Sequence, residues 1–219
     1  MLKGFYLAVP CSLAITTMAV VAFASEETDA DRPQAQLESV AEKGEQNRSD
    51  SSRIHPDQKA LDRASKAKLL PSGVKSLLRV PTTLRHGEYV WNDDGIPSGK
   101  ITVFVDIRRQ MMSVFQGGHE IGTSVIVYGG PGSESPIGVF PIKSKYRDYH
   151  SRTYDAPMPH SMFLTNDGVA IHGNVMAAYR ATKGCIGLPP EFAKLLFEKA
   201  KRGDRVEIRA SDPDLLQTT

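Results

Sequence analysis

The stretch Ile101-Thr102-Val103-Phe104-Val105-Asp106-Ile107 decides the fold, because it is dense in the β-branched and aromatic residues that favour a buried strand. Residues 111–115 and 121–128 repeat this pattern after short breaks at Arg108-Arg109 and Gln116-Gly117-Gly118. Apolar runs that follow one another across such short breaks predict an antiparallel β-meander.

Downstream of the meander, the sequence predicts further strands and one helix. Residues 138–142 and 205–209 have strand patterns, and residues 162–164 and 169–171 flank Asn166-Asp167-Gly168, a sequence typical of a tight hairpin turn. After Pro189-Pro190, apolar side chains recur at helical spacing as far as Gly203. We therefore expect a mainly β fold, β-sandwich-like with mixed sheets, and one helix late in the chain.

The segments outside this region are poorer in apolar residues. Between Ser25 and Arg53 the chain has eight acidic and four basic residues and no aromatic residue, which indicates a segment without a core. We expect a disordered or partly helical linker over 25–70, in which a charged helix near 56–70 acts as a solvated tether. Residues 71–98 are expected to extend the domain at its N-terminus, the domain itself covers 99–209, and 210–219 form a loose tail.

Residues 1–24 resemble a secretory signal. Lys3 precedes an uncharged stretch, and Ala22-Phe23-Ala24 has the small-x-small form that precedes cleavage. An uncleaved membrane anchor is the alternative, and it would be the chain's only membrane contact. Cleavage removes Cys11 and leaves Cys185 as the one cysteine, which points to a reactive thiol, an intermolecular partner or a small buried hydrophobe.

The composition excludes several classes of protein. With 27 Lys and Arg against 25 Asp and Glu, the formal charge of +2 argues against a dedicated nucleic-acid binder. Two cysteines in 219 residues exclude a disulfide-rich scaffold and a four-cysteine zinc site. The run Gly129-Gly130-Pro131-Gly132 lacks the Gly-Lys-Ser/Thr of a phosphate-binding loop, so we interpret it as a turn.

Cys185 and His172 are the candidates for covalent catalysis. A thiol needs a base or a positive field to become a thiolate near neutral pH, and His172 ends a predicted strand from which it could meet Cys185 if residues 174–180 fold back. A purely structural histidine is the alternative. A zinc site built from His150, His160, His172 and Cys185 has no support in their spacing, so we expect no metal.

Several elements in this order resemble the L,D-transpeptidase (YkuD-type) catalytic domain of bacterial cell-wall enzymes. They are the strand at 101–105, Ser135-Pro136-Ile137-Gly138-Val139-Phe140, Met158-Pro159 with Met162-Phe163, Ile171-His172-Gly173, Gly184-Cys185-Ile186 and the terminal residues 203–208. The resemblance covers residues 99–209. It implies a mostly β catalytic domain without a cofactor that acts on peptidoglycan stem peptides in the periplasm or cell envelope.

The resemblance also implies roles for individual residues. Cys185 would attack the carbonyl of the L-centre of a diamino acid and expel the terminal D-alanine, leaving a thioester that an amine resolves into a cross-link. His172 would be the base, oriented by the carbonyl of Gly173, and the N–H groups of Gly184 and Cys185 would stabilise the oxyanion. The residues expected to bind substrate are Lys183, Arg180, Tyr146, Met158 and His160.

This chain departs from the family pattern at two positions beside Cys185. Lys183 replaces a histidine, and its ammonium could lower the pKa of the thiol but could not reproduce the hydrogen bonding of an imidazole. Gly187 removes a polar side chain together with its substrate contact. An L,D-carboxypeptidase or related hydrolase on the same scaffold, and a non-catalytic wall-binding module, therefore remain as alternative functions. The sequence does not determine the oligomeric state.

Overall fold

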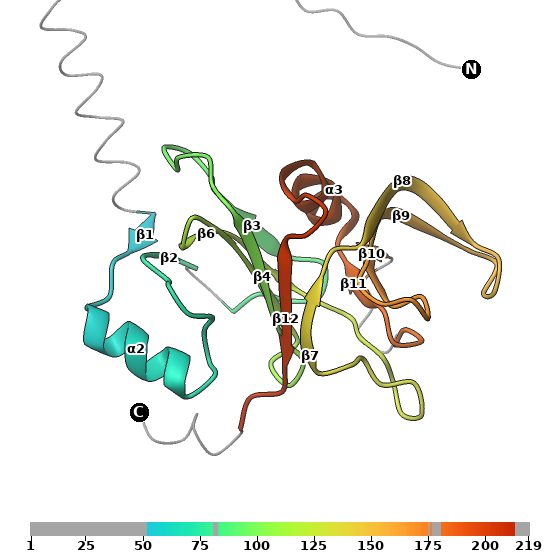
Figure 1. Cartoon of the computed structure of the whole chain (residues 1–219), viewed down its shortest axis with the longest axis horizontal. Coiled ribbons are helices and arrows are strands. Elements are labelled where there is room, and N and C mark those ends of the chain that lie inside the picture. Colours follow the sequence, from blue (N-terminus) through green and yellow to red (C-terminus); the bar gives the residue numbers. More distant parts are fainter. Residues whose placement is uncertain (1–51, 81–82, 175, 177–180, 213–219) are drawn as a thin grey trace, which may run out of the picture. The chain divides into compact units, whose positions relative to one another are not determined.

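The computed structural model describes residues 52–80, 83–174, 176 and 181–212 (Figure 1). They belong to one compact unit, residues 42–219. The predicted signal segment, the predicted linker before Ser52 and the tail after Asp212 lie outside the described residues. Neither helix within the described ranges has the length and apolar character that a membrane span requires.

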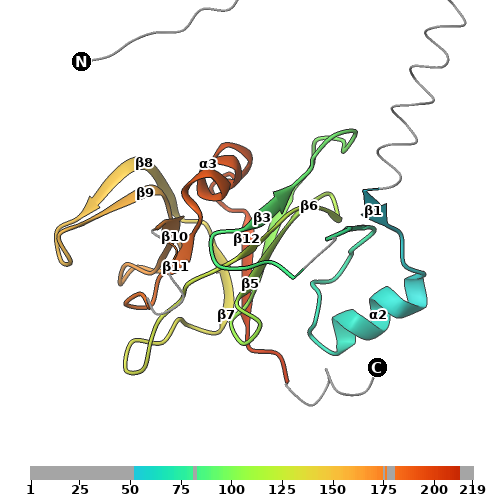
Figure 2. The same cartoon turned by 180° about the vertical axis from the view of Figure 1, so that it is seen from behind.

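A six-stranded sheet forms the centre of the unit (Figures 1 and 2). Its order is β3-β6-β5-β4-β12-β7, and β12 runs parallel to β4. The predicted meander is confirmed, since β4, β5 and β6 pair antiparallel in sequence order. The strands are β3 (Tyr89–Trp91), β4 (Ile101–Asp106), β5 (Met111–Gln116), β6 (His119–Val125), β7 (Gly138–Pro141) and β12 (Arg205–Arg209).

A second, four-stranded sheet has the order β11-β10-β9-β8. The strands are β8 (Ser144–Ser151), β9 (Ala156–Phe163), β10 (Ala170–Gly173) and β11 (Ile186–Leu188). The hairpin predicted around residues 166–168 is confirmed by the antiparallel pairing of Ala170 with Phe163. The long β8–β9 hairpin, which extends away from α3 in both views, was not predicted from the sequence (Figures 1 and 2).

Helix α3 (Pro190–Lys199) packs against β9 and β10 and buries one face in the main core. Pro190 opens the helix, and Phe192, Ala193 and Leu196 have no exposed surface. The rings of Tyr89 and Trp91 lie 5.5 and 5.4 Å from that of Phe192, so β3 is joined to the same core. The predicted fold class is confirmed: the fold is mainly β with mixed sheets and few helices.

Residues 53–78 form a strap that packs on the six-stranded sheet. Strand β1 (Arg53–Ile54) pairs with β2 (Leu77–Leu78), and α2 (Gln58–Lys66) lies between them in sequence. Leu61 of α2 is 6% exposed and clusters with Val74, Phe104 and Phe115. The helix expected near 56–70 is present, but the solvated tether is wrong, because Leu61 is buried and Leu70 packs against the same cluster.

Arg53 fastens the start of the strap. Its guanidinium is buried and donates hydrogen bonds to the carbonyl oxygens of Glu120 and Asn92, both at 2.6 Å. The Glu120 carboxylate in turn accepts from the N–H of Leu78 at 2.9 Å, and burial raises the pKa of this carboxyl above its ordinary value. These bonds satisfy groups that would otherwise be buried without partners.

Truncating Leu61 to alanine should lower the free energy of unfolding by about 2–3 kcal/mol, since the change removes buried methyl groups from a small cluster. Urea denaturation of the full chain measures this change. The exposed Lys59 on the same helix supplies the control, and Lys59→Ala should shift stability by less than about 0.5 kcal/mol. Equal free energies of unfolding for the two variants would mean that Leu61 adds no packing energy and that the helix is a solvated tether.

Candidate active site

Parallel pairing of β10 with β11 brings His172 and Cys185 to one face of the small sheet. Ile171 pairs with Ile186 and His172 with Gly187, so Cys185 precedes β11 level with Ala170. Side chains alternate between the faces of a strand, and paired residues share a face. Because Ile171 and Ile186 face the main core, His172 and Cys185 lie on the other face, which we call the thiol face.

The His172 ring is 6% exposed and is fixed by its neighbour in the chain. Nδ1 lies 2.8 Å from the carbonyl oxygen of Gly173, which can only accept a hydrogen bond. Nδ1 therefore carries the proton, and Nε2 keeps a free lone pair. Burial lowers the pKa of His172 below its ordinary value, and the bond to Gly173 opposes this shift only in part.

The Cys185 thiol is 8% exposed and packs in an apolar cluster with Met158, Ala170, Tyr149 and Phe163. Sγ donates a weak hydrogen bond to the carbonyl oxygen of Gly168 at 3.8 Å. Burial raises the pKa of the thiol, and the N–H of Ala170 opposes this shift in part. Between these two described side chains there is no hydrogen bond from Sγ to the His172 ring.

These shifts leave the thiol and the imidazole uncharged at neutral pH. The pKa of His172 is lowered and that of Cys185 is raised, so the proton stays on sulfur in the resting pair. Lys183 was expected to lower the pKa of the Cys185 thiol. Its ammonium is exposed, and burial has the largest effect on that pKa and raises it. Such a pair can transfer the proton from Sγ to Nε2 as the thiol attacks.

Gly184 shapes the backbone immediately before Cys185. It is buried with φ +96°, a left-handed conformation that side chains rarely adopt. Thr182 holds the same turn, because its hydroxyl donates to the carbonyl of Cys185 and its N–H donates to the carbonyl of Tyr128. The turn is thus anchored at both ends.

The glycine-rich segment at 129–132 is a turn, as predicted, and it lies beside this backbone. Gly129 forms a bridge with Thr182, and the N–H of Ser133 donates to the carbonyl of Gly130. Pro131 followed by Gly132 at φ +76° is typical of a type II turn. The turn is evident from the sequence, but its contact with the residues before Cys185 is not.

Gly187 lies opposite His172 in a space that other side chains fill. A Cβ at position 187 would lie 2.5 Å from Cγ2 of Val127 and 3.0 Å from Nδ2 of Asn174. Val127 exchanges both backbone hydrogen bonds with Gly187, and Asn174 follows His172 by two residues on the same side of β10. Neither residue was predicted from the sequence, although Asn174 directly follows the His-Gly pair.

Gly187→Ala should destabilise the protein by about 1–3 kcal/mol, because the added methyl group overlaps Val127 in a packed region. Thermal unfolding of this variant and of Lys183→Ala, an exposed neighbour, measures the effect. We expect a clear loss in melting temperature for the first variant and almost none for the second. Equal melting temperatures would mean that the site has room for a side chain at 187.

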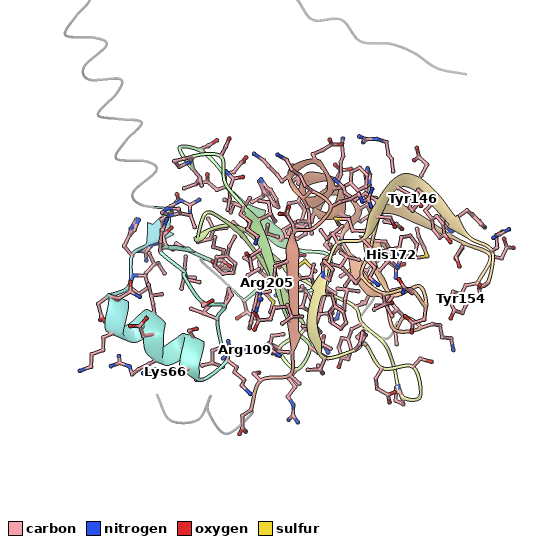
Figure 3. All side chains as sticks on the ribbon, in the orientation of Figure 1. Lys66, Arg109, Tyr146, Tyr154, His172 and Arg205 are labelled. Carbon is pink, nitrogen blue, oxygen red and sulfur yellow. The ribbon has the colours of Figure 1, made fainter. Side chains whose placement is uncertain are left out.

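Of the other predicted site residues, some lie near Cys185 and others do not. Met158 lies in the Cys185 cluster, and Tyr146 lies on β8 with its ring against Tyr149 and Phe163 (Figure 3). His160 does not join them: its ring packs against Phe197 of α3 with centroids 5.4 Å apart. Lys183 is exposed beside Gly184, and Arg180 lies outside the described residues.

Residues 100–208 match the family described as the L,D-transpeptidase catalytic domain, YkuD, and this part of the chain belongs to that family. No curated protein matches the sequence. The predicted family is thereby confirmed.

Solved structures with a similar fold include three L,D-transpeptidases. The one from Stackebrandtia nassauensis is 25% identical, with a TM-score of 0.49, and the match covers 55% of this chain and 61% of that one. The one from Mycobacterium smegmatis is 22% identical, with a TM-score of 0.47 and coverages of 51% and 59%. A cysteine-to-serine mutant from Enterococcus faecium is 26% identical, with a TM-score of 0.46 and coverages of 51% and 50%. The chain thus spans less than two thirds of each.

Proposed function

We propose that the protein is an exported, cysteine-dependent L,D-transpeptidase that acts on peptidoglycan stem peptides. The observation that carries this proposal is the placement of His172 and Cys185 on one face of adjacent parallel strands, with His172 Nδ1–H bonded to the carbonyl of Gly173. A base with a free Nε2 beside a lone thiol is the arrangement that thioester chemistry needs.

The reaction begins with the transfer of the Cys185 proton to His172 Nε2 while Sγ attacks the carbonyl carbon of the diamino acid. This step requires a rotation about the Cα–Cβ bond of Cys185 that takes Sγ away from the carbonyl oxygen of Gly168. Hydrogen bonds of catalytic groups are often long before substrate binds, so the arrangement found here is compatible with this step.

The tetrahedral intermediate carries a negative oxygen, and we assign its stabilisation to the N–H groups of Gly184 and Cys185. The C–N bond to D-alanine then breaks, and His172 gives its proton to the departing amine. The amine of a neighbouring stem attacks the resulting thioester, loses a proton to His172 and forms the new amide, and the thiolate recovers that proton. The proton taken from sulfur thus leaves with D-alanine, and the proton lost by the acceptor amine restores the thiol.

Substrate binding involves the residues around the thiol. Met158 packs beside Cys185, Tyr146 lies further along the same face, and the cations Lys183 and Arg180 suit the anionic carboxylates of the stem. Residues 1–24 direct the chain out of the cytoplasm, so the substrate and the enzyme meet in the periplasm or cell envelope.

A single experiment tests the proposal and also the two alternative functions. Water could replace the acceptor amine, which would make the protein an L,D-carboxypeptidase. The alternative of a non-catalytic wall-binding module rests on the protonated thiol directed at Gly168 and on Lys183 in place of the family histidine.

The experiment incubates the full chain with disaccharide tetrapeptides from peptidoglycan and identifies the products by mass spectrometry. Cross-linked dimers with released D-alanine are the expected result, and tripeptide alone would indicate the carboxypeptidase. If neither product forms while the protein still binds isolated cell wall, the transpeptidase proposal is wrong and the binding module is favoured.

A further inference from the structure

An aromatic strip lies on the thiol face, at the end of the small sheet remote from β11. It consists of Tyr146 and Tyr149 on β8 and Phe163 on β9. The ring of Phe163 lies 5.0 Å from that of Tyr149 and 5.9 Å from that of Tyr146, both edge to face. The two tyrosine rings are 5.8 Å apart. Mutual contacts of this kind restrict the orientations of each ring.

The strip is continuous with the surroundings of the thiol. Tyr149 and Phe163 pack against the cluster of Met158, Ala170 and Cys185. Tyr146 is the outermost member and keeps 51% of its surface exposed although it contacts two other rings. The strip therefore ends in a fixed, half-exposed aromatic ring (Figure 3).

The distance from Cys185 to this ring matches the length of a stem peptide. In the order β11-β10-β9-β8, three strand spacings separate the two residues and the register places Tyr146 two residues further along, which makes about 16 Å between the two backbone positions. From the scissile carbonyl, the stem runs back through three residues, about 10 Å when extended, and then through the lactyl group that joins it to the sugar. A stem that crosses the sheet from Cys185 would thus place its sugar at Tyr146.

We propose that the aromatic strip binds the sugar of the glycan strand that carries the donor stem. This assignment rests on the proposed transpeptidase function for the identity of the stem. The apolar C–H face of a pyranose ring stacks on the Tyr146 ring. The Tyr146 hydroxyl stays in water and can form a hydrogen bond with the sugar. Because the ring is already held by Tyr149 and Phe163, little ordering accompanies binding.

The test compares the disaccharide tetrapeptide with the same tetrapeptide lacking sugar. For the wild-type chain we expect kcat/KM to be roughly three- to tenfold higher for the sugar-bearing substrate, through KM. Tyr146→Ala should abolish this preference, and Tyr146→Phe should keep most of it. Tyr154→Ala is the matched control, since Tyr154 is exposed on the same hairpin and belongs to no ring pair of the strip.

A preference that survives in Tyr146→Ala would overturn the proposal. A fall in kcat/KM of equal size for both substrates would overturn it as well, because Tyr146 would then contact the peptide rather than the sugar.

A binding measurement separates this inference from the proposed function. Nuclear magnetic resonance titration of the full chain with the N-acetylglucosamine–N-acetylmuramic acid disaccharide alone should shift the Tyr146 ring signals, and Tyr146→Ala should remove the binding. This result without any turnover would support the glycan site while the transpeptidase proposal fails. Turnover by the wild type without Tyr146-dependent sugar recognition would support the enzyme and reject the site.

Discussion

Replacing Cys185 by alanine is expected to lower the rate of acyl transfer by roughly 10⁴-fold or more and to prevent any covalent intermediate. The thiol is the only group in this mechanism that forms a bond to the substrate, so nothing else can carry the acyl group. Release of D-alanine from tetrapeptide, followed by mass spectrometry, measures the loss.

The fold should survive this substitution, because the side chain is small and lies in a satellite cluster rather than in the main core. A melting temperature near that of the wild type would establish that the lost rate is chemical. Lys59→Ala is the control, since Lys59 is exposed on α2 and has no part in the proposed site, and it should keep its turnover within about tenfold of the wild type. Residual activity of Cys185→Ala near the wild-type rate would exclude this thiol as the nucleophile.

Replacing His172 by glutamine should lower kcat by roughly 10²–10⁴-fold, the usual contribution of a positioned general base. The raised pKa of Cys185 makes the base necessary, since very little thiolate exists at neutral pH without it. Wild-type activity should fall in acid only below the ordinary histidine pKa, because burial lowers the pKa of His172 and keeps Nε2 unprotonated down to lower pH. On the alkaline side, activity should fall when the thiol ionises, because the pair then lacks the proton that His172 passes to D-alanine. The raised pKa of Cys185 should delay this fall beyond the ordinary pKa of a thiol.

The pH dependence of kcat/KM checks both limbs. His172→Gln should lose the acid limb that belongs to the imidazole and gain activity with rising pH as the thiol ionises by itself. An acid limb that persists unchanged in this variant would assign the titration to another group and contradict the role of His172.

The central strands could be predicted because their apolar side chains are local and dense. Most side chains of residues 101–106 and 111–115 are buried in the sheet, and the turn at 166–168 closes the hairpin that its Asp-Gly predicts. Strand β8 could not be found in this way, since it carries polar side chains on both faces. Lys145, for example, crosses to α3 and donates to the carbonyls of Phe197 and Ala200.

The strap escaped prediction for a different reason. Its attachment depends on Leu61 and on the bonds of Arg53 to carbonyls of the central sheet, and those partners are distant in the sequence. Arginine is usually exposed and its sequence context does not show when it is buried, so composition alone indicated a solvated tether.

At the site, the residue types that carry chemistry were visible in the sequence, but their surroundings were not. His172 and Cys185 were identified together with the Gly173 carbonyl, and the parallel register of β10 and β11 explains how they share a face. The positions of Asn174 and Val127 over Gly187, and the turn of His160 toward Phe197, depend on packing between strands and helix that no local pattern encodes.

Trapping the acyl-enzyme tests the central claim most directly. The full chain is mixed with tetrapeptide in the absence of an acceptor amine, quenched in acid and analysed by intact mass and by mapping of the fragment that contains Cys185. The proposed mechanism predicts a mass gain equal to the stem without its terminal D-alanine, located on Cys185 and absent from Cys185→Ala. D-alanine release without such an adduct under any quench time, or an adduct on another residue, would contradict it.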